Sequence, residues 1–181
     1  MNKKQFDPFN DRESRDIRNG LSTSLAQSIQ TKNPNLLGKQ LEKIAAAHSE
    51  KIYQDYINDR RQRFEAVLQP IFKNQISNIL EQGVLLWNQH LFFEFHELLE
   101  GRWLKAEGRE RIFLQGLIRA AGTSIHLERG NMKGAGKMSQ KAIDNLSEPQ
   151  SRPEIGNLDE LIKWLERPDQ EPPVLVYCGQ E

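Results

Sequence analysis

The stretch "FFEFHELLEGRW", residues 92–103, places a histidine and a glutamate inside an apolar helix pattern. At about 100° per residue, His96 and Glu100 share a helix face with four large apolar side chains, Phe92, Phe93, Leu99 and Trp103. Glu97 flanks this face, and Glu94 points away from it toward solvent. An imidazole beside a carboxylate can hold a metal ion, act as an oriented base or bridge two helices. The stretch therefore predicts a polar site in the middle of a buried helix face.

The next helix pattern, residues 109–127, carries a second polar line. Its members are spaced at i, i+4, i+7 and i+11: Gln115, Arg119, Gly122 and His126. The other side is apolar: Phe113, Leu114, Leu117, Ala120 and Ala121. Gly116 and Gly122 leave room for another helix to approach. Because buried polar groups need partners, we expect the two polar lines to face each other, so that Glu97 or Glu100 meets Arg119 with both histidines nearby.

Three interpretations of this buried polar network remain open. In the first, "HELLE" resembles a zinc motif in which Glu100 replaces the second histidine, and His126 could be the third ligand. Against it, the fixed positive charge of Arg119 would repel a divalent metal ion, and the paired Glu-x-x-His signature of di-iron bundles is absent. Alternatively, Arg119 binds an anion with help from Gln115 and the histidines, and His96 beside Glu100 acts as a base. The third interpretation is a structural network that fixes helix register.

The positions of the helices follow from apolar periodicity, caps and breakers. We expect a helix over about 36–68, a second beginning at Pro70 and reaching Trp87, and others over 90–105 and 109–127. Gly130 ends the last of these and Asn131 caps the next, which runs to about residue 146. Asn157 caps a final helix that stops before Pro168. The fold class is therefore all-α, a bundle of five to seven helices with short connections.

Both chain ends differ from the main helical domain, which we place at 36–167. Within residues 1–35, apolar side chains recur every four residues, at Ile17, Leu21, Leu25 and Ile29, which predicts a short amphipathic helix. This helix either docks on the main domain or mediates self-association or binding of a protein partner. Residues 168–181 form an extended tail whose "VLVY" segment is expected to lie against the body.

The composition narrows the class of protein. The 181 residues carry a net charge of +0, so no overall field attracts nucleic acid or an anionic membrane. No apolar run approaches the roughly 20 residues of a membrane helix, and the first residues lack a secretory pattern. Cys178 is the single cysteine and excludes an internal disulfide. A soluble, cytoplasmic protein is therefore expected. Separately, the sequence shows no partner for His48.

Three motifs, "FFEFHELLEGRW", "LQGLIRAAG" and "HLERGNMKGA", together resemble the domain of unknown function 309 family. The resemblance covers about residues 85–146. It matches a set of motif positions: His96, Glu97, Glu100, Trp103, Gln115, Gly116, His126, Gly130, Asn131, Gly134 and Ala135. It implies an all-helical domain and no established activity or cofactor, and it assigns no shared role to Arg119. The segment before residue 70 looks similar to an extended subgroup.

We interpret the chain as a binding or interaction module built round the buried His/Glu/Gln/Arg site. Trp103, Gly116, Gly130, Asn131 and Gly134 are expected to shape the helices and turns rather than to bind. The alternative is a metal-dependent or acid–base hydrolase that uses His96, Glu100 and His126.

Overall fold

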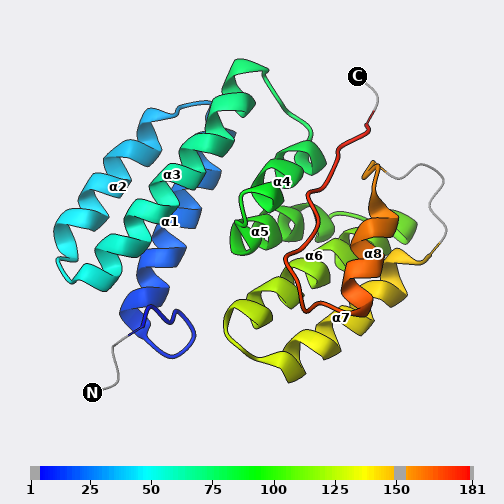
Figure 1. The fold of residues 1–181 in the computed structure, drawn as a ribbon. Coiled ribbons are helices and arrows are strands. Elements are labelled where there is room, and N and C mark those ends of the chain that lie inside the picture. Colours follow the sequence, from blue (N-terminus) through cyan, green and yellow to red (C-terminus); the bar gives the residue numbers. More distant parts are fainter. Residues whose placement is uncertain (1–4, 149–153, 180–181) are drawn as a thin grey trace. The chain divides into compact units, whose positions relative to one another are not determined.

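The computed structural model describes residues 5–148 and 154–179. Within these ranges the regular elements are helices, apart from one isolated antiparallel bridge between Ile155 and Tyr177. The all-α prediction is confirmed, but the described residues hold eight helices rather than five to seven (Figure 1). Contacts divide the chain into two compact units, Met1–Ile76 and Ser77–Glu181. This division differs from the predicted boundaries near residues 35 and 167. No helix in the described ranges is both long and apolar enough to cross a membrane.

The first unit contains three helices: α1 (Arg12–Gln30), α2 (Asn35–Ala47) and α3 (Lys51–Lys73). The amphipathic N-terminal helix is present and longer than expected. Its side chains Ile17, Leu21 and Leu25 are at most 2% exposed, because α2 and α3 pack against that face. Residues 12–30 are therefore part of this unit's core, and the apolar face suggested as a partner surface is already covered.

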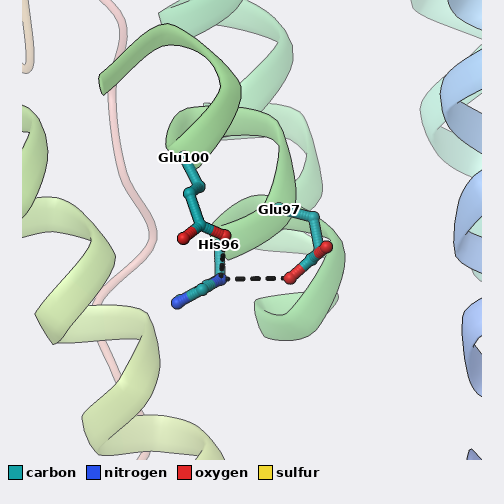
Figure 2. Close-up of side chains that lie close together, drawn as sticks. All are labelled: His96, Glu97 and Glu100. Atoms are coloured by element: carbon teal, nitrogen blue, oxygen red, sulfur yellow. Dashed lines mark ion pairs between the residues drawn. The ribbon is translucent and has the colours of Figure 1, made fainter. Parts of the chain in front are cut away.

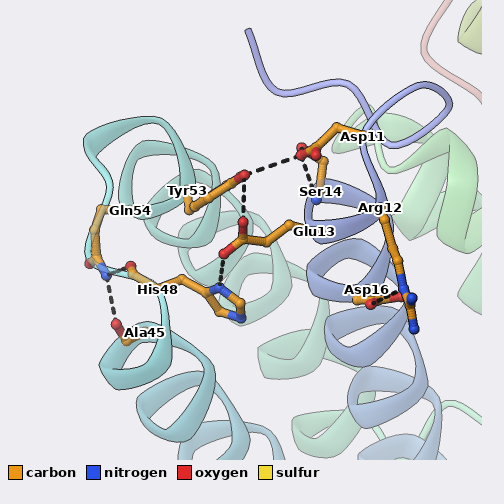
Figure 3. Close-up of polar contacts among 9 residues, drawn as sticks. All are labelled: Asp11, Arg12, Glu13, Ser14, Asp16, Ala45, His48, Tyr53 and Gln54. Carbon is orange, nitrogen blue, oxygen red and sulfur yellow. Dashed lines mark hydrogen bonds and ion pairs between the residues drawn. The ribbon is translucent and has the colours of Figure 1, made fainter. Parts of the chain in front are cut away.

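The predicted helix over 36–68 is interrupted at residues 48–50, where His48 and Glu50 adopt extended backbone conformations. Hydrogen bonds stabilise this break: Gln54 Nε2 donates to the carbonyls of Ala45 and His48 at 2.7 and 2.6 Å. The His48 ring reaches α1, with Nδ1 2.8 Å from Glu13 Oε1 (Figure 3). That partner is 35 residues away along the chain, so no local pattern revealed it.

The same polar network fastens the start of α1 to α3. The Tyr53 hydroxyl donates to Glu13 at 3.0 Å and lies 3.2 Å from Asp11 (Figure 3). Asp11 is the N-cap of α1 and accepts from the backbone N–H of Ser14 at 2.9 Å. A side-chain cap of this kind satisfies an N–H that the helix itself cannot pair. The network thus fixes both where α1 begins and how it lies on α3.

The prediction that Pro70 starts a helix is wrong. Pro70 lies in the last turn of α3, which ends at Lys73, and the following helix, α4 (Ile79–Asn88), begins after the Asn78 cap. A proline beyond the first turn gives up one i→i−4 hydrogen bond, and burial of the next residue, Ile71, which is 3% exposed, favours continuing α3 through it. The side chain of Asn78 accepts from the N–H groups of Leu80 and Glu81, which marks the true start.

The second unit contains α4 and four further helices: α5 (Phe92–Trp103), α6 (Gly108–Glu128), α7 (Met132–Leu146) and α8 (Leu158–Glu166). An aromatic cluster occupies its core. The Trp87 ring centroid lies 5.1, 5.3 and 6.3 Å from those of Phe92, Phe95 and Trp164. Edge-to-face geometries such as these add to the stabilisation from burial, so α4, α5 and α8 are held together by aromatic packing.

The extended C-terminal tail lies against this second unit, as the sequence predicted for "VLVY". Leu175 is 2% exposed, and its N–H and carbonyl bond the Asn88 amide at 2.8 and 2.9 Å. Trp87 Nε1 donates to the Pro173 carbonyl at 2.8 Å. Asn157 precedes α8 as expected, but its side chain bonds the backbone of Val174 and Val176 instead of capping the helix.

Leu21→Ala should destabilise the first unit by about 2–5 kcal/mol, because the side chain is fully buried and its removal leaves a cavity. Leu36→Ala is the matched control, since Leu36 is 36% exposed and should cost less than about 1 kcal/mol. Urea unfolding followed through the backbone amide signals of α2 and α3 measures both. Equal effects of the two substitutions would show that α1 is not part of this core.

Candidate functional site

The core face of α5 is rotated relative to the predicted one. The buried members of the helix are Phe92, Glu94, Phe95 and Leu99. At about 100° per residue, Phe95 lies a quarter turn from His96, so the face centred on Phe95 enters the core and His96 lies at its edge. Glu94 is 4% exposed, and the prediction that it points to solvent is wrong. The side chain of His96 is 30% exposed.

His96, Glu97 and Glu100 form a compact cluster on this edge of α5, and each can offer a ligand atom within 4.8 Å of the others. The Nδ1 atom of His96 lies 3.3 Å from Glu97 Oε1 and 3.9 Å from Glu100 Oε2. Figure 2 shows both carboxylates beside the imidazole. The two glutamates are nearly half exposed, at 49% and 46%. The site is therefore accessible from solvent rather than deeply buried.

The His96 Nδ1 atom is itself shielded from solvent, and it makes no hydrogen bond with any described residue. The 3.3 Å approach of Glu97 is an ion-pair distance without hydrogen-bond geometry. Neither Glu97 nor Glu100 forms an ion pair with a lysine or arginine in the described ranges. Two carboxylates thus share one imidazole nitrogen, with no fixed positive charge to neutralise them, and this arrangement attracts a cation.

The polar line of α6 faces α7 rather than α5. The Arg119 guanidinium donates to the Asn145 side chain and, at 3.3 Å, to the Lys141 carbonyl, both on α7. The predicted pairing of Arg119 with Glu97 or Glu100 is therefore wrong. A helix with two neighbours can satisfy its polar line on either side, and sequence periodicity alone does not say which. Gln115 is half-buried, and its side chain forms no hydrogen bond with the described residues.

Gly116 and Gly122 of α6 lie at the contact with α7. A Cβ at Gly116 would come within 2.6 Å of Leu146, and one at Gly122 within 3.1 Å of Met138. The sequence predicted that another helix approaches closely at these two glycines but did not say which one; the structure shows that it is α7. The two helices approach so closely because glycine leaves the backbone of α6 bare at these positions, so that side chains of α7 can pack directly against it.

His126 supports the turn between α6 and α7. Gly130 adopts φ +67, and Asn131 then caps α7 by accepting from the Gly134 N–H at 2.9 Å. This leaves the Asn131 amide group to donate to His126 Nδ1 at 3.2 Å, so that nitrogen is an acceptor and is already engaged. A Cβ at Gly134 would lie 2.6 Å from the same nitrogen. These four motif residues thus form one capping arrangement.

His126 does not join the cluster on α5. The four-residue connection 104–107 makes α5 and α6 an antiparallel hairpin, in which position 96 lies level with about position 115. His126 is eleven residues farther on, about 16 Å along the helix axis. The predicted set of His96, Glu100 and His126 is therefore not brought together, and Glu97 takes the third place.

Trp103 helps to close the hairpin between α5 and α6. The Arg111 guanidinium lies 4.1 Å from the centre of the Trp103 ring, and its NH1 donates to the carbonyls of Trp103 and Ala106 at 3.1 and 3.3 Å. A cation over an indole face is favourable, most of all when partly shielded. Trp103 therefore holds the turn that sets α5 against α6, consistent with a structural role.

The comparison with protein families gives one match, to a model described as "Domain of unknown function (DUF309)" over residues 80–138. The DUF309 resemblance is confirmed for this segment. The matched segment contains the His96 cluster, the Gly116 contact and the turn around Asn131, and it overlaps most of the predicted 85–146. The family description records no activity. Searches of curated proteins and of solved structures each found no significant match.

Gly134→Ala should destabilise the second unit by about 1–2 kcal/mol, because the added methyl displaces the ring of His126 and breaks the Asn131 cap. Gly136→Ala is the matched control two residues along, where a Cβ meets nothing within 4 Å and the better helix propensity of alanine should stabilise by up to about 1 kcal/mol. Tryptophan fluorescence during urea unfolding reports on this unit, since Trp87, Trp103 and Trp164 all lie in it. Stabilisation by both substitutions would contradict the proposed packing of His126.

Proposed function

We propose that the protein is a helical binding module that holds a divalent metal ion through His96, Glu97 and Glu100. The observation that carries this proposal is the shielded Nδ1 atom of His96 with two carboxylate oxygens beside it, at 3.3 and 3.9 Å. Tetrahedral ligands about 2.1 Å from a zinc ion stand about 3.4 Å from one another. The two carboxylate oxygens thus lie close to that distance from Nδ1, and all three donor atoms lie within 4.8 Å of one another.

The fold supports this spacing. The three residues occupy positions i, i+1 and i+4 of one helix, and α5 is anchored by Phe95 and Leu99, which are at most 1% exposed. A site on a rigid helix loses less conformational freedom on binding than one on a loop. The sequence predicted that the positive charge of Arg119 would repel a metal ion at this site. In the structure Arg119 instead hydrogen-bonds to α7.

The donor set indicates which ions fit. One imidazole and two carboxylates suit zinc, manganese or iron, whereas calcium takes six to eight oxygen ligands. Three protein donors leave positions open on the ion for water or for a ligand's oxygen atom. The proposal is one of binding and not of catalysis, because His126, the other residue of the hydrolase alternative, accepts from Asn131 instead.

The competing explanation is that the cluster only stabilises α5 through an i, i+4 ion pair. Exposed pairs of this kind contribute about 0.3–0.5 kcal/mol. A pair of that strength needs no second carboxylate and gives no response to added metal. The two explanations therefore differ in what zinc does to the stability of the protein.

Zinc should stabilise the protein by about 2.7 kcal/mol when its free concentration is a hundred times the dissociation constant. We would use untagged Cys178→Ser protein, because Cys178 is exposed and its thiol could bind zinc separately. Urea unfolding followed by tryptophan fluorescence, with zinc or with a chelator, gives the stabilisation, and isothermal titration gives the stoichiometry.

His96→Ala should abolish the zinc response while lowering metal-free stability by less than about 1 kcal/mol. Glu100→Gln should weaken zinc binding at least about tenfold, since it removes a charged ligand while keeping the shape of the side chain. Glu166→Gln, an exposed glutamate at the end of α8, is the matched control and should bind as the parent does. A zinc response that survives His96→Ala, or an equal response to calcium, would refute the proposal.

A further inference from the structure

A groove lined by both polar and apolar groups runs between α1 and α2 in the first unit, with a volume of about 590 Å³. Its lining residues come from both helices: Asn19, Gly20, Thr23, Ser24, Gln27, Leu36, Lys39, Gln40 and Lys43. The groove is open to solvent along one side, and its volume falls within the range of about 300–1,000 Å³ of small-molecule sites. It has no residue in common with the cluster on α5.

The groove forms because each of the two helices turns one line of side chains into the core and a neighbouring line toward the other helix. On α1, Ile17, Leu21 and Leu25 enter the core, and a neighbouring line at i, i+4 and i+8 faces the groove: Asn19, Thr23 and Gln27. On α2, buried Leu37, Leu41 and Ile44 leave a second line at i, i+3 and i+7: Leu36, Lys39 and Lys43. Gly20 permits the close contact at one end, where a Cβ would lie 3.2 Å from Ile44.

The groove is positively charged. Lys39 and Lys43 line it, and none of its lining residues, all in the described part of the chain, is acidic. Neither ammonium group forms a hydrogen bond or an ion pair with a described residue; Glu42, between them on α2, stands beyond the 4.0 Å of an ion pair. Arg18 donates to the side chain of the lining residue Asn19 at 3.0 and 3.2 Å, and its guanidinium lies over the Phe9 ring.

We propose that this groove binds a phosphorylated small molecule that also carries hydroxyl groups. Lysines at i and i+4 have Cβ atoms about 6 Å apart, so their long side chains can converge on one phosphate. Lysine acts as a point charge toward the tetrahedral oxygens of phosphate. The amides of Asn19, Gln27 and Gln40 and the hydroxyl of Thr23 then supply hydrogen bonds for the hydroxyl groups of the ligand.

Titration of the full chain with ribose 5-phosphate, followed by backbone amide NMR at low ionic strength, tests the proposal. The expected result is saturable shifts confined to residues 19–27 and 36–43. Neutral ribose should give no saturable shift, and inorganic phosphate should bind more weakly than the sugar phosphate. Ribose binding as well as ribose 5-phosphate, or inorganic phosphate binding equally tightly, would overturn the proposal.

The variant Lys39→Gln/Lys43→Gln should weaken binding of ribose 5-phosphate at least about tenfold, because two charge-assisted contacts are lost. The matched control is Lys137→Gln/Lys141→Gln, which removes the same charge at the same i, i+4 spacing from the exposed surface of α7. The control should bind as the unsubstituted protein does. Equal weakening by the two double variants, or shifts scattered over lysines throughout the chain, would show only general attraction of anions.

Discussion

The second unit depends on how α6 satisfies its polar side chains while packed between two helices. Buried hydrogen-bonding groups that lack partners cost free energy, so the polar line of α6 had to meet a polar surface on one neighbour. It meets α7, where Arg119 donates to Asn145 and Asn131 donates to His126. Gly116 and Gly122 let the two backbones approach closely enough for these contacts. The other side of α6 is apolar and is left for α5.

This arrangement determines the character of the cluster on α5. Because α6 turns its apolar side toward α5, His96, Glu97 and Glu100 receive no counter-charge from it and lie at the edge of the interface. They remain partly exposed on a helix whose opposite face, centred on Phe95, is fixed in the aromatic core. A rigid, accessible and uncompensated pair of carboxylates beside an imidazole is suited to bind a cation. A deeply buried network would instead have been suited to fix helix register.

Several features of the fold could be predicted from the sequence because their causes are local. Gly130 and Asn131 mark a helix end and a helix start through backbone conformation and capping, and both are found as predicted. The polar line of α6 and the buried face of α1 follow from helical periodicity. The break at His48 could not be predicted, because its partner Glu13 lies on another helix. The prediction that a helix starts at Pro70 was wrong for a related reason, because packing against the rest of the unit keeps α3 helical for one turn beyond it.

The sequence by itself determined the all-α class, the amphipathic N-terminal helix, the turn at Gly130 and Asn131, the resemblance to DUF309 and the identity of the residues able to do chemistry. These depend on backbone conformation, side-chain type and spacing, which act over a few residues. Only the tertiary structure decided which residues come together: His96 with Glu97 and Glu100 rather than with His126, Arg119 with Asn145 rather than with a glutamate, and Lys39 with Asn19 and Thr23 across a groove. Helical periodicity specifies the buried face of a helix only to within about a quarter turn, and it does not say which neighbouring helix covers that face. The exact rotation of each helix and the identity of its neighbour are set by packing of the whole unit.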